Sequence, residues 1–239
     1  MYRIIADTHT HTLVCDHAYS TVGENAEAAR EKGLHAIITS MAGAPTWMHF
    51  GNLGAVPREL CGVRIIKGAE VNIMDYDGAL DLEQRILEKM EWVIASMHTL
   101  TLLPGTKEQH TNAWLTVTEN PLVDVLGHVG DGRFSFDHEP VLKAVKKTGK
   151  IIEINSHSFK VREGSEVNCK DIALLCMELE IPVVVSSDAH HADFIGDFTR
   201  ALTMLEGIDF PEYLIINADK DRFFKVIEER KFDKSGAVT

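Results

Sequence analysis

Short apolar runs rich in β-branched residues alternate along the chain with stretches whose apolar residues follow a helical spacing. The apolar runs predict strands at Arg3–Asp7, His35–Thr39, Arg64–Val71, Trp92–His98, Asp124–His128, Lys150–Asn155 and Pro182–Ser187. The helical spacing predicts helices at Glu24–Lys32, Leu82–Met90, Asn112–Glu119, Glu139–Lys147, Ser165–Leu179 and Asp219–Arg230. The longest stretch with neither pattern, Gly43–Pro57, is predicted to be a lid or surface loop, and Asp233–Thr239 is predicted to fray.

This order of elements indicates an α/β fold. Strands that are apolar throughout and alternate with helices are typical of a parallel sheet with helices covering it. About seven such units either close into a barrel slightly smaller than the eight-stranded one or wind into an open sheet. No repeat, low-complexity tract or linker divides residues 1–239, so we expect a single domain.

Composition narrows the functional classes. The net charge of −12 argues against a nucleic-acid partner, although an acidic protein can still carry a positive site where metal ions bind. The four cysteines form neither a Cys-x-x-Cys pair nor a zinc-finger spacing, which favours a reducing compartment. The first apolar run is too short for a signal peptide, and no run approaches the roughly 20 residues of a membrane span. We therefore expect a cytoplasmic protein with no membrane partner.

Histidines and carboxylates gather at the ends of the predicted strands. His9 and His11 follow the first strand, and residues i and i+2 of an extended chain point to the same side. Such a pair is weak evidence alone, because the chain has 12 histidines. Later strand ends add further metal-ligand types, namely Glu70, His98, His128, Asp188 and His190. The carboxyl ends of barrel strands meet on one face, so the sequence predicts a multinuclear metal site there.

Together these motifs resemble the PHP family, the metal-dependent phosphoesterases named for polymerase and histidinol phosphatase, and most of all its YcdX-like phosphatase branch. The similarity covers nearly the whole chain and includes His9-x-His11, His17–Thr21, Gly68–Asn72, Arg162–Asn168 and Asp188–His190. It implies a distorted (β/α)7 TIM-like barrel with the metal site at the carboxyl ends of the strands. It also implies hydrolysis of a small-molecule phosphomonoester by a single PHP-type domain.

The resemblance implies three metal sites that hold two or three divalent ions of zinc, manganese or iron. The first would be formed by His9, His11, Glu70 and Asp188. The second would be formed by Glu70, His98 and His128, with Glu70 bridging the two ions. The third would be formed by His17, His190 and the histidine of a Thr-Asp-His motif.

The third site departs from the family pattern, because Ser40 and Met41 stand where the family has Asp and His. A thioether is a soft, poor ligand for Zn²⁺ or Mn²⁺. His49 could substitute for the lost ligand, the third ion could be absent, or the protein could have lost much of its catalysis. We favour an intact binuclear core beside a weak or altered third site.

The implied chemistry is hydrolytic. Two ions that share a water lower its pKa, and the resulting hydroxide would attack phosphorus. Glu70 would bridge the ions, Asp188 would orient the water, and His17 and His190 would bind phosphate or protonate the leaving oxygen. Arg162 is the candidate phosphate clamp, and the alternative for it is an ion pair with Glu163 or Glu166.

Four alternatives remain at this stage. A histidinol-phosphatase-like enzyme or a nuclease acting on DNA ends would share the same ligands, although the acidic charge argues against DNA. An amidohydrolase also begins with His-x-His, but its pattern favours a lysine bridge where this chain has Glu70. A metal-binding PHP domain with weak or lost catalysis is the last alternative. The sequence leaves homo-oligomer formation open.

Overall fold

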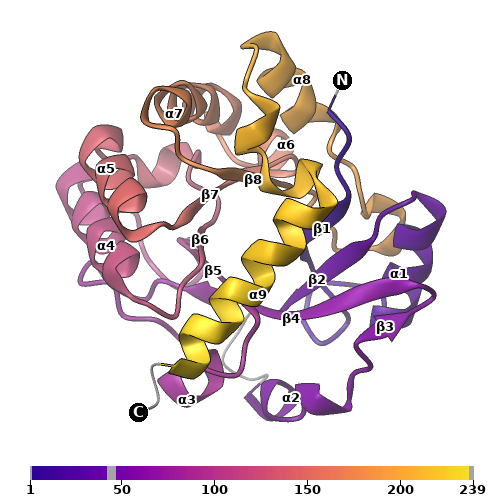
Figure 1. Cartoon of the computed structure of the whole chain (residues 1–239). Coiled ribbons are helices and arrows are strands. Elements are labelled where there is room, and N and C mark those ends of the chain that lie inside the picture. Colours follow the sequence, from indigo (N-terminus) through magenta and orange to yellow (C-terminus); the bar gives the residue numbers. More distant parts are fainter. Residues whose placement is uncertain (1, 42–46, 237–239) are drawn as a thin grey trace.

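The computed structural model describes residues 2–41 and 47–236. Its core is a parallel sheet in which neighbouring strands pair in the order β1, β2, β4, β5, β6, β7 and β8 (Figure 1). Their bounds are Ala6–Thr10, Ala36–Met41, Val63–Asn72, Trp92–Ser96, Val125–Leu126, Ile151–Asn155 and Val183–Ser186. The short strand β3 (Glu59–Leu60) adds an antiparallel hairpin to β4.

The sheet curls into a nearly closed barrel, so the open-sheet alternative is excluded. The gap between β8 and β1 is spanned by an isolated parallel bridge between Thr10 and Ala189. The side chain of Asn217 completes the junction at the other end. It donates to the carbonyls of Ala6 and Val185 at 2.8 and 2.7 Å and accepts from Val185 N at 3.0 Å. One buried amide thus satisfies backbone groups that the missing ladder leaves unpaired.

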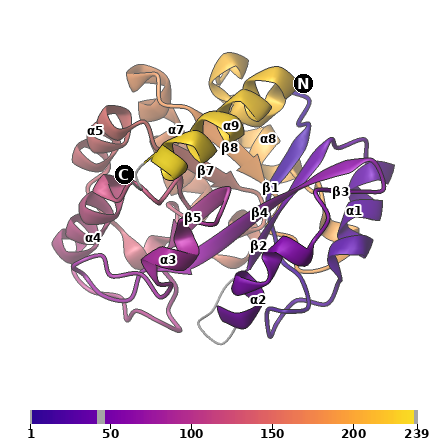
Figure 2. The same ribbon diagram turned by 60° about the horizontal axis from the view of Figure 1, so that its bottom comes forward.

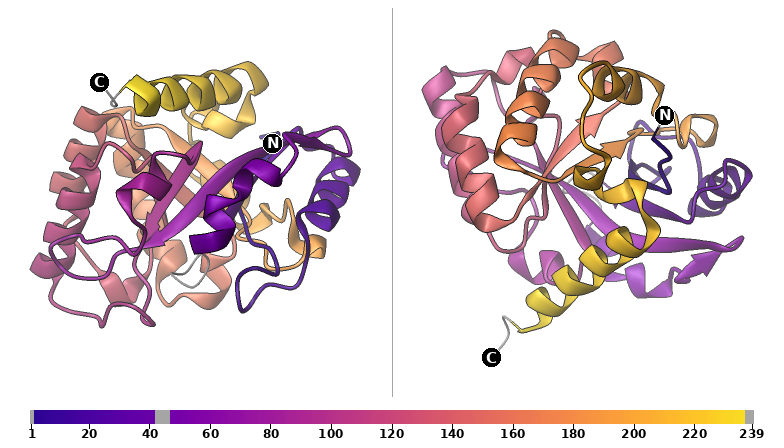
Figure 3. Two further views of the ribbon diagram at one scale, coloured as in Figure 1. Left: turned by 90° about the horizontal axis from the view of Figure 1, so that it is seen from below. Right: turned by 45° about the horizontal axis from the view of Figure 1, so that its top comes forward.

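Helices cover the outside of the barrel (Figure 3). The longer ones are α1 (Val22–Glu31), α4 (Lys107–Glu119), α5 (His138–Thr148), α7 (Ser165–Leu179), α8 (Thr199–Gly207) and α9 (Lys220–Gly236). Their ends follow local signals. Thr106 caps α4 in a reciprocal bond pair with Gln109, and Gly149 ends α5 in a left-handed conformation. None of the helices among the described residues is long and apolar enough to span a membrane.

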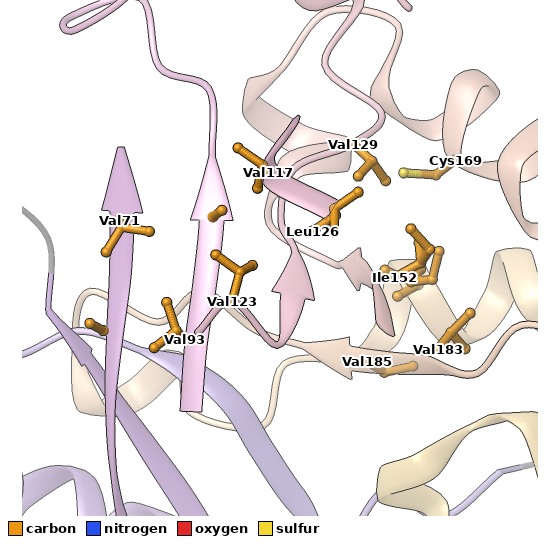
Figure 4. Packing of buried hydrophobic residues seen from close by; sticks show 14 of the residues in the cluster. Val71, Val93, Val117, Val123, Leu126, Val129, Ile152, Cys169, Val183 and Val185 are labelled. Carbon is orange, nitrogen blue, oxygen red and sulfur yellow. The ribbon is translucent and has the colours of Figure 1, made fainter. Parts of the chain in front are cut away.

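Successive residues of each strand point to opposite faces of the sheet and form two apolar layers. One set points outward and packs under the helices, as Figure 4 shows for Val93, Leu126 and Ile152. The other set fills the barrel below the strand ends, where Phe223 and Ile227 of α9 close it. This interior layer consists of Ile5, Ala6, Ala36, Ile38, Ile66, Trp92, Ile94, Val125, Ile151, Val184, Ile216, Phe223 and Ile227. Toward the carboxyl ends of the strands, the next residues that point into the barrel are polar, such as Glu70 and Glu153.

Several predicted elements differ from the observed ones. The stretch 43–57 contains the helix α2 (Trp47–Gly51) and a 3-10 turn (Leu53–Ala55), and residues 43–46 of it lie outside the described part. Figure 2 shows α2 and the short helix α3 (Gln84–Leu87) beside β4. The helix predicted at residues 82–90 is much shorter in the structure, where α3 has only four residues. The helix α8 was not predicted. The last helix reaches Gly236 instead of fraying from residue 233.

Candidate metal centre

The first strand carries its histidines inside the barrel. The strand β1 begins at Ala6, later than the sequence predicts, and extends to Thr10, so it includes His9. Its polar residues Asp7, Thr8 and Thr10 are buried as well. The pairing of β1 with β2 slips between Asp7 and Thr10, where one extra residue is accommodated. Such a bulge redirects side chains. The bulge lies at the segment that contains His9, whose imidazole points into the site.

Six side chains from five strand ends form what we call the inner group. It comprises His9, His11, Glu70, His98, His128 and Asp188. The Nε2 atoms of His9 and His11 lie 3.0 Å apart. They lie 3.4 and 3.5 Å from Oε2 of Glu70, and the His11 nitrogen is 3.2 Å from Oδ1 of Asp188. The residues predicted for the first site therefore converge.

The other oxygen of Glu70 faces a second set of imidazoles. Its Oε1 lies 3.0 Å from Nε2 of His128 and 3.4 Å from Nε2 of His98. Glu70 thus turns one oxygen to each half of the inner group. This is the arrangement expected for a carboxylate that bridges two ions.

The inner group fits divalent cations. Oε1 of Glu70 and Oδ1 of Asp188 are buried, and neither has a hydrogen-bond partner among the described residues. Imidazole nitrogens lie close to both oxygens, so the side chains turn their ligand atoms toward one shared space. Buried unpaired carboxylate oxygens are costly unless a cation is present. Mixed nitrogen and oxygen donors of this kind suit zinc, manganese or iron.

Each inner histidine is oriented by a partner on its Nδ1 atom. Four different groups serve: a carboxylate oxygen of Glu153 at 2.7 Å for His9, the Asn72 amide oxygen at 2.7 Å for His98, the Ser158 hydroxyl at 2.9 Å for His128, and the Cys15 sulfur at 3.4 Å for His11. These contacts leave Nε2 directed at the centre, as in metal-binding histidines generally.

Glu153 was not predicted as a functional residue from the sequence. Its signal was available, because a single carboxylate stands between Ile152 and Ile154 in an otherwise apolar strand. Ser158 was missed as well, and it carries no comparable signal.

Opposite charges inside the inner group shift the pKa values of its members. Burial opposes the charged form of His9, but the carboxylates of Glu70, Glu153 and Asp188 outweigh it and raise the pKa of His9 well above its usual value. Burial likewise opposes charge on His11, yet the adjacent carboxylate of Asp188 helps to raise its pKa to about 9. Burial lowers the pKa of His98 to about 4. The buried carboxylates thus favour positive charge at His9 and His11.

Two inner residues have unusual backbones. His128 and Asp188 adopt positive φ angles of 52° and 53°, in the left-handed region that few non-glycine residues adopt, although His and Asp do so more often than most. Such conformations persist where surrounding contacts hold them, and they are common at functional sites. Each residue lies two positions beyond the end of its strand, β6 or β8, so both left-handed turns fall at the carboxyl ends of the barrel strands.

A second cluster, the outer group, consists of His17 and His190. Their rings lie 4.6 Å apart, and the His190 ring stacks on His11 at 4.4 Å. His190 also combines with His11 and Asp188 into a set of donors that could hold an ion. Burial, with the neighbouring His11, lowers the pKa of His190 to about 4.

The altered third site falls only partly within the described residues. Ser40 is buried at the end of β2, and its hydroxyl has no hydrogen-bond partner in the described part of the chain. The side chain of Met41 lies outside the described part. His49 is half-buried in α2 and belongs to none of the donor groups that the described residues form. Its proposed role as a substitute ligand stays a prediction.

A cavity of about 270 Å³ opens over both groups. Its walls include Val14, Leu100 and Arg162. Arg162 is not paired with Glu163 or Glu166, because its Nη1 instead donates to Asp131 at 3.2 Å. Its Nε is buried and has no partner among the described residues. The guanidinium is thus anchored at one nitrogen, and the side chain lines the cavity.

Comparisons with known proteins agree with this geometry. A scan against protein-family models finds no match. The chain is 42% identical to a probable phosphatase of Acetivibrio thermocellus over 234 residues, which cover 96% of this chain and 97% of the relative. It is 39% identical to a probable phosphatase of Photobacterium profundum, with 95% of each chain covered.

Solved structures support the fold. A histidinol phosphate phosphatase from Lactococcus lactis, complexed with zinc, L-histidinol and phosphate, superposes with a TM-score of 0.61 at 18% identity. The match covers 86% of this chain and 94% of the Lactococcus chain. A chain of an archaeal ribonuclease P structure also superposes with a TM-score of 0.61, at 13% identity. This match covers 95% of the present chain and 91% of the other chain. The barrel is therefore similar in fold to that of the histidinol phosphate phosphatase. By its similarity to the curated relatives, the chain belongs to their family of probable phosphatases.

Proposed function

We propose that the protein is a metal-dependent phosphatase that hydrolyses a small-molecule phosphomonoester, as its resemblance to the YcdX-like branch implies. One observation carries the proposal: Glu70 turns one oxygen to each of two sets of imidazoles at the floor of a cavity. A shared carboxylate between two cation positions is the arrangement that in-line displacement at phosphorus uses. Residues 1–239 act as one domain in this proposal.

The inner group would hold two ions. His9, His11 and Asp188 would bind the first, His98 and His128 the second, and Glu70 both. The ions would supply Lewis acidity, which acidifies water and neutralises charge on phosphoryl oxygens. Asp188 has one oxygen toward His11 and the other toward His128, so its lone pairs can also accept a proton from water.

Arg162 is suited to binding the phosphoryl group. Asp131 holds one of its nitrogens and also pairs with Arg133 at 2.6 Å, so Asp131 is a fixed anchor. The planar guanidinium can then present its other donors to two phosphoryl oxygens. Replacement of Arg162 by lysine would keep the charge but lose the paired donors.

The two histidines of the outer group would have different roles in the reaction. His190, with its pKa near 4, is neutral at pH 7. Its Nδ1–H donates to the backbone oxygen of Asp188 at 2.8 Å, so its Nε2 can accept a hydrogen bond or a proton but has no proton to give. His17 is exposed at the cavity wall and is the better candidate to protonate the leaving oxygen. Val14 and Leu100 line the outer cavity and would contact the organic part of the substrate.

Hydrolysis of para-nitrophenyl phosphate tests the proposal. The protein is reconstituted with Zn²⁺ or Mn²⁺ and compared with Glu70→Gln and Asp188→Asn. We expect turnover that both substitutions abolish. Metal uptake without turnover of this ester or of histidinol phosphate would instead favour a metal-binding domain that has lost catalysis. The cytoplasmic location remains a prediction from the sequence.

A further inference from the structure

Glu153 is a carboxylate in the interior of the barrel. It lies in the middle of β7, between residues that pack outward under the helices, and it is only 1% exposed. The next inward residue below it is Ile151, in the apolar layer closed by α9. An isolated carboxylate in such a place is strongly unfavourable unless donors surround it. Its surroundings therefore indicate what it does.

Both oxygens of Glu153 accept hydrogen bonds. Oε1 lies 2.7 Å from Nδ1 of His9 and accepts from the Ser186 hydroxyl at 2.7 Å. Oε2 accepts from the backbone N–H of His128 at 3.0 Å. The partners come from β1, β8 and the end of β6. A single side chain thus connects both halves of the inner group from below.

The barrel makes room for this carboxylate at Gly127. A Cβ atom built on Gly127 would lie 2.5 Å from the Ser96 hydroxyl, 2.5 Å from an Ile94 methyl and 3.2 Å from Oε2 of Glu153. Any other residue there would crowd the space that these atoms fill. Gly127 also directly precedes His128, whose backbone has the positive φ angle. The position is therefore shaped around the carboxylate and the strained turn together.

We propose that Glu153 is a positioning residue that orients two metal ligands, one through its ring and one through its backbone. By accepting from Nδ1–H of His9, it fixes the tautomer whose Nε2 lone pair faces the centre. By accepting from the amide of His128, it holds the left-handed backbone that directs this side chain toward Glu70. The inference rests on the proposed metal centre, and it adds a residue that touches neither ion nor substrate.

Replacement by glutamine separates this role from general packing, because the side chain keeps its shape. A glutamine amide has only one oxygen, while His9 and His128 each present a donor. If the oxygen faces His9, the NH₂ group opposes the N–H of His128. If it faces His128, the NH₂ group forces the other tautomer on His9, whose Nε2 then carries a proton and cannot bind a cation. Either orientation disturbs one half of the inner group.

The test measures metal affinity directly. Zn²⁺ is titrated against a chromogenic chelator with the wild type, Glu153→Gln and the control Glu91→Gln. Glu91 is also buried and accepts from a backbone amide, Lys67 N at 3.1 Å, but it lies at the opposite end of the barrel. We expect Glu153→Gln to weaken the binding of at least one of the two ions by about 10- to 100-fold, and Glu91→Gln to leave the binding of both within about threefold.

Equal zinc affinity in the wild type and Glu153→Gln would overturn the inference, even if the phosphatase assay succeeds. Should Glu153→Gln fail to fold by circular dichroism, Glu153→Asp carries the same test. It keeps the charge but withdraws the carboxylate by one methylene, so an unchanged affinity would again refute the role. A wild type that binds zinc with the expected dependence on Glu153 but hydrolyses no phosphate ester would reject the proposed function alone.

Discussion

The inner and outer groups use the same residue types but are held in different ways. His9 and His11 are no more than 1% exposed, and each has a side-chain partner on Nδ1. In the outer group, the His190 side chain is 26% exposed, and its Nδ1 donates to the backbone oxygen of Asp188 at 2.8 Å, with Oδ1 of the same residue 3.6 Å away. His17 is exposed. Proximity alone does not make a metal site, because a ligand also needs a partner that fixes its direction. We therefore expect tight binding in the inner group and weak binding in the outer one.

Glu70→Gln is expected to have the largest effect, because it removes the negative charge of the carboxylate that turns one oxygen to each half of the inner group. Loss of its charge leaves two sets of imidazoles without a bridge. We expect metal content to fall to below about one ion per chain and the rate of aryl phosphate hydrolysis to fall by about 10³-fold or more. Mass spectrometry of bound metal and a rate assay measure both. Two retained ions would show that the bridge is dispensable.

The pH dependence of metal affinity sharpens the comparison further. His11, with a pKa of about 9 in the metal-free protein, is protonated at pH 7, and a cation must displace that proton. Affinity should therefore rise with pH up to about 9, by about tenfold per pH unit for each proton displaced. Zinc titrations between pH 6.5 and 9 with a chelator of known proton affinity measure the slope. A flat profile would contradict the protonated inner group.

His190→Ala probes the outer group. Since the inner ligands keep their own partners, we expect the content of tightly bound metal to stay unchanged while kcat falls by about tenfold. Metal analysis after dialysis and steady-state kinetics give the two numbers. Loss of the inner ions in this variant would mean that the two groups form one unit, contrary to their different exposure.

Leu100→Ser is expected to have the smallest effect. Leu100 is 97% exposed and lines the outer cavity, so the substitution should not change the melting temperature. It should lower kcat/KM for aryl phosphates by about threefold while leaving glycerol phosphate unaffected, because only the apolar ester gains from contact with leucine. A uniform change for both esters would place Leu100 outside the substrate path.

Much of this architecture could be predicted from the sequence. Most strands contain continuous apolar runs, as in Trp92–Ala95, and the strand ends carry residue types that commonly bind metal ions. Parallel strands then require those ends to meet. These two facts suffice to predict that Glu70, His98 and His128 lie together at one end of the barrel.

Other features depend on contacts between distant segments. Asn217 closes the barrel only because three elements bring their backbones to it, and no local pattern indicates this. The turn of the first strand into the site depends on a bulge against β2. The helix α8 did carry a signal, since Ala201, Met204 and Leu205 follow a helical spacing and are buried. The helix α8 could therefore have been predicted from the sequence, but its pattern was overlooked.

The central claim, that the inner group binds two ions and uses them to hydrolyse phosphate esters, is tested most directly by metal content and turnover on one sample. The protein is purified without chelators, analysed by inductively coupled plasma mass spectrometry, and assayed with para-nitrophenyl phosphate. We expect about two tightly held ions per chain together with turnover. Fewer than about one ion, and no activity after Zn²⁺ or Mn²⁺ is added back, would contradict the account.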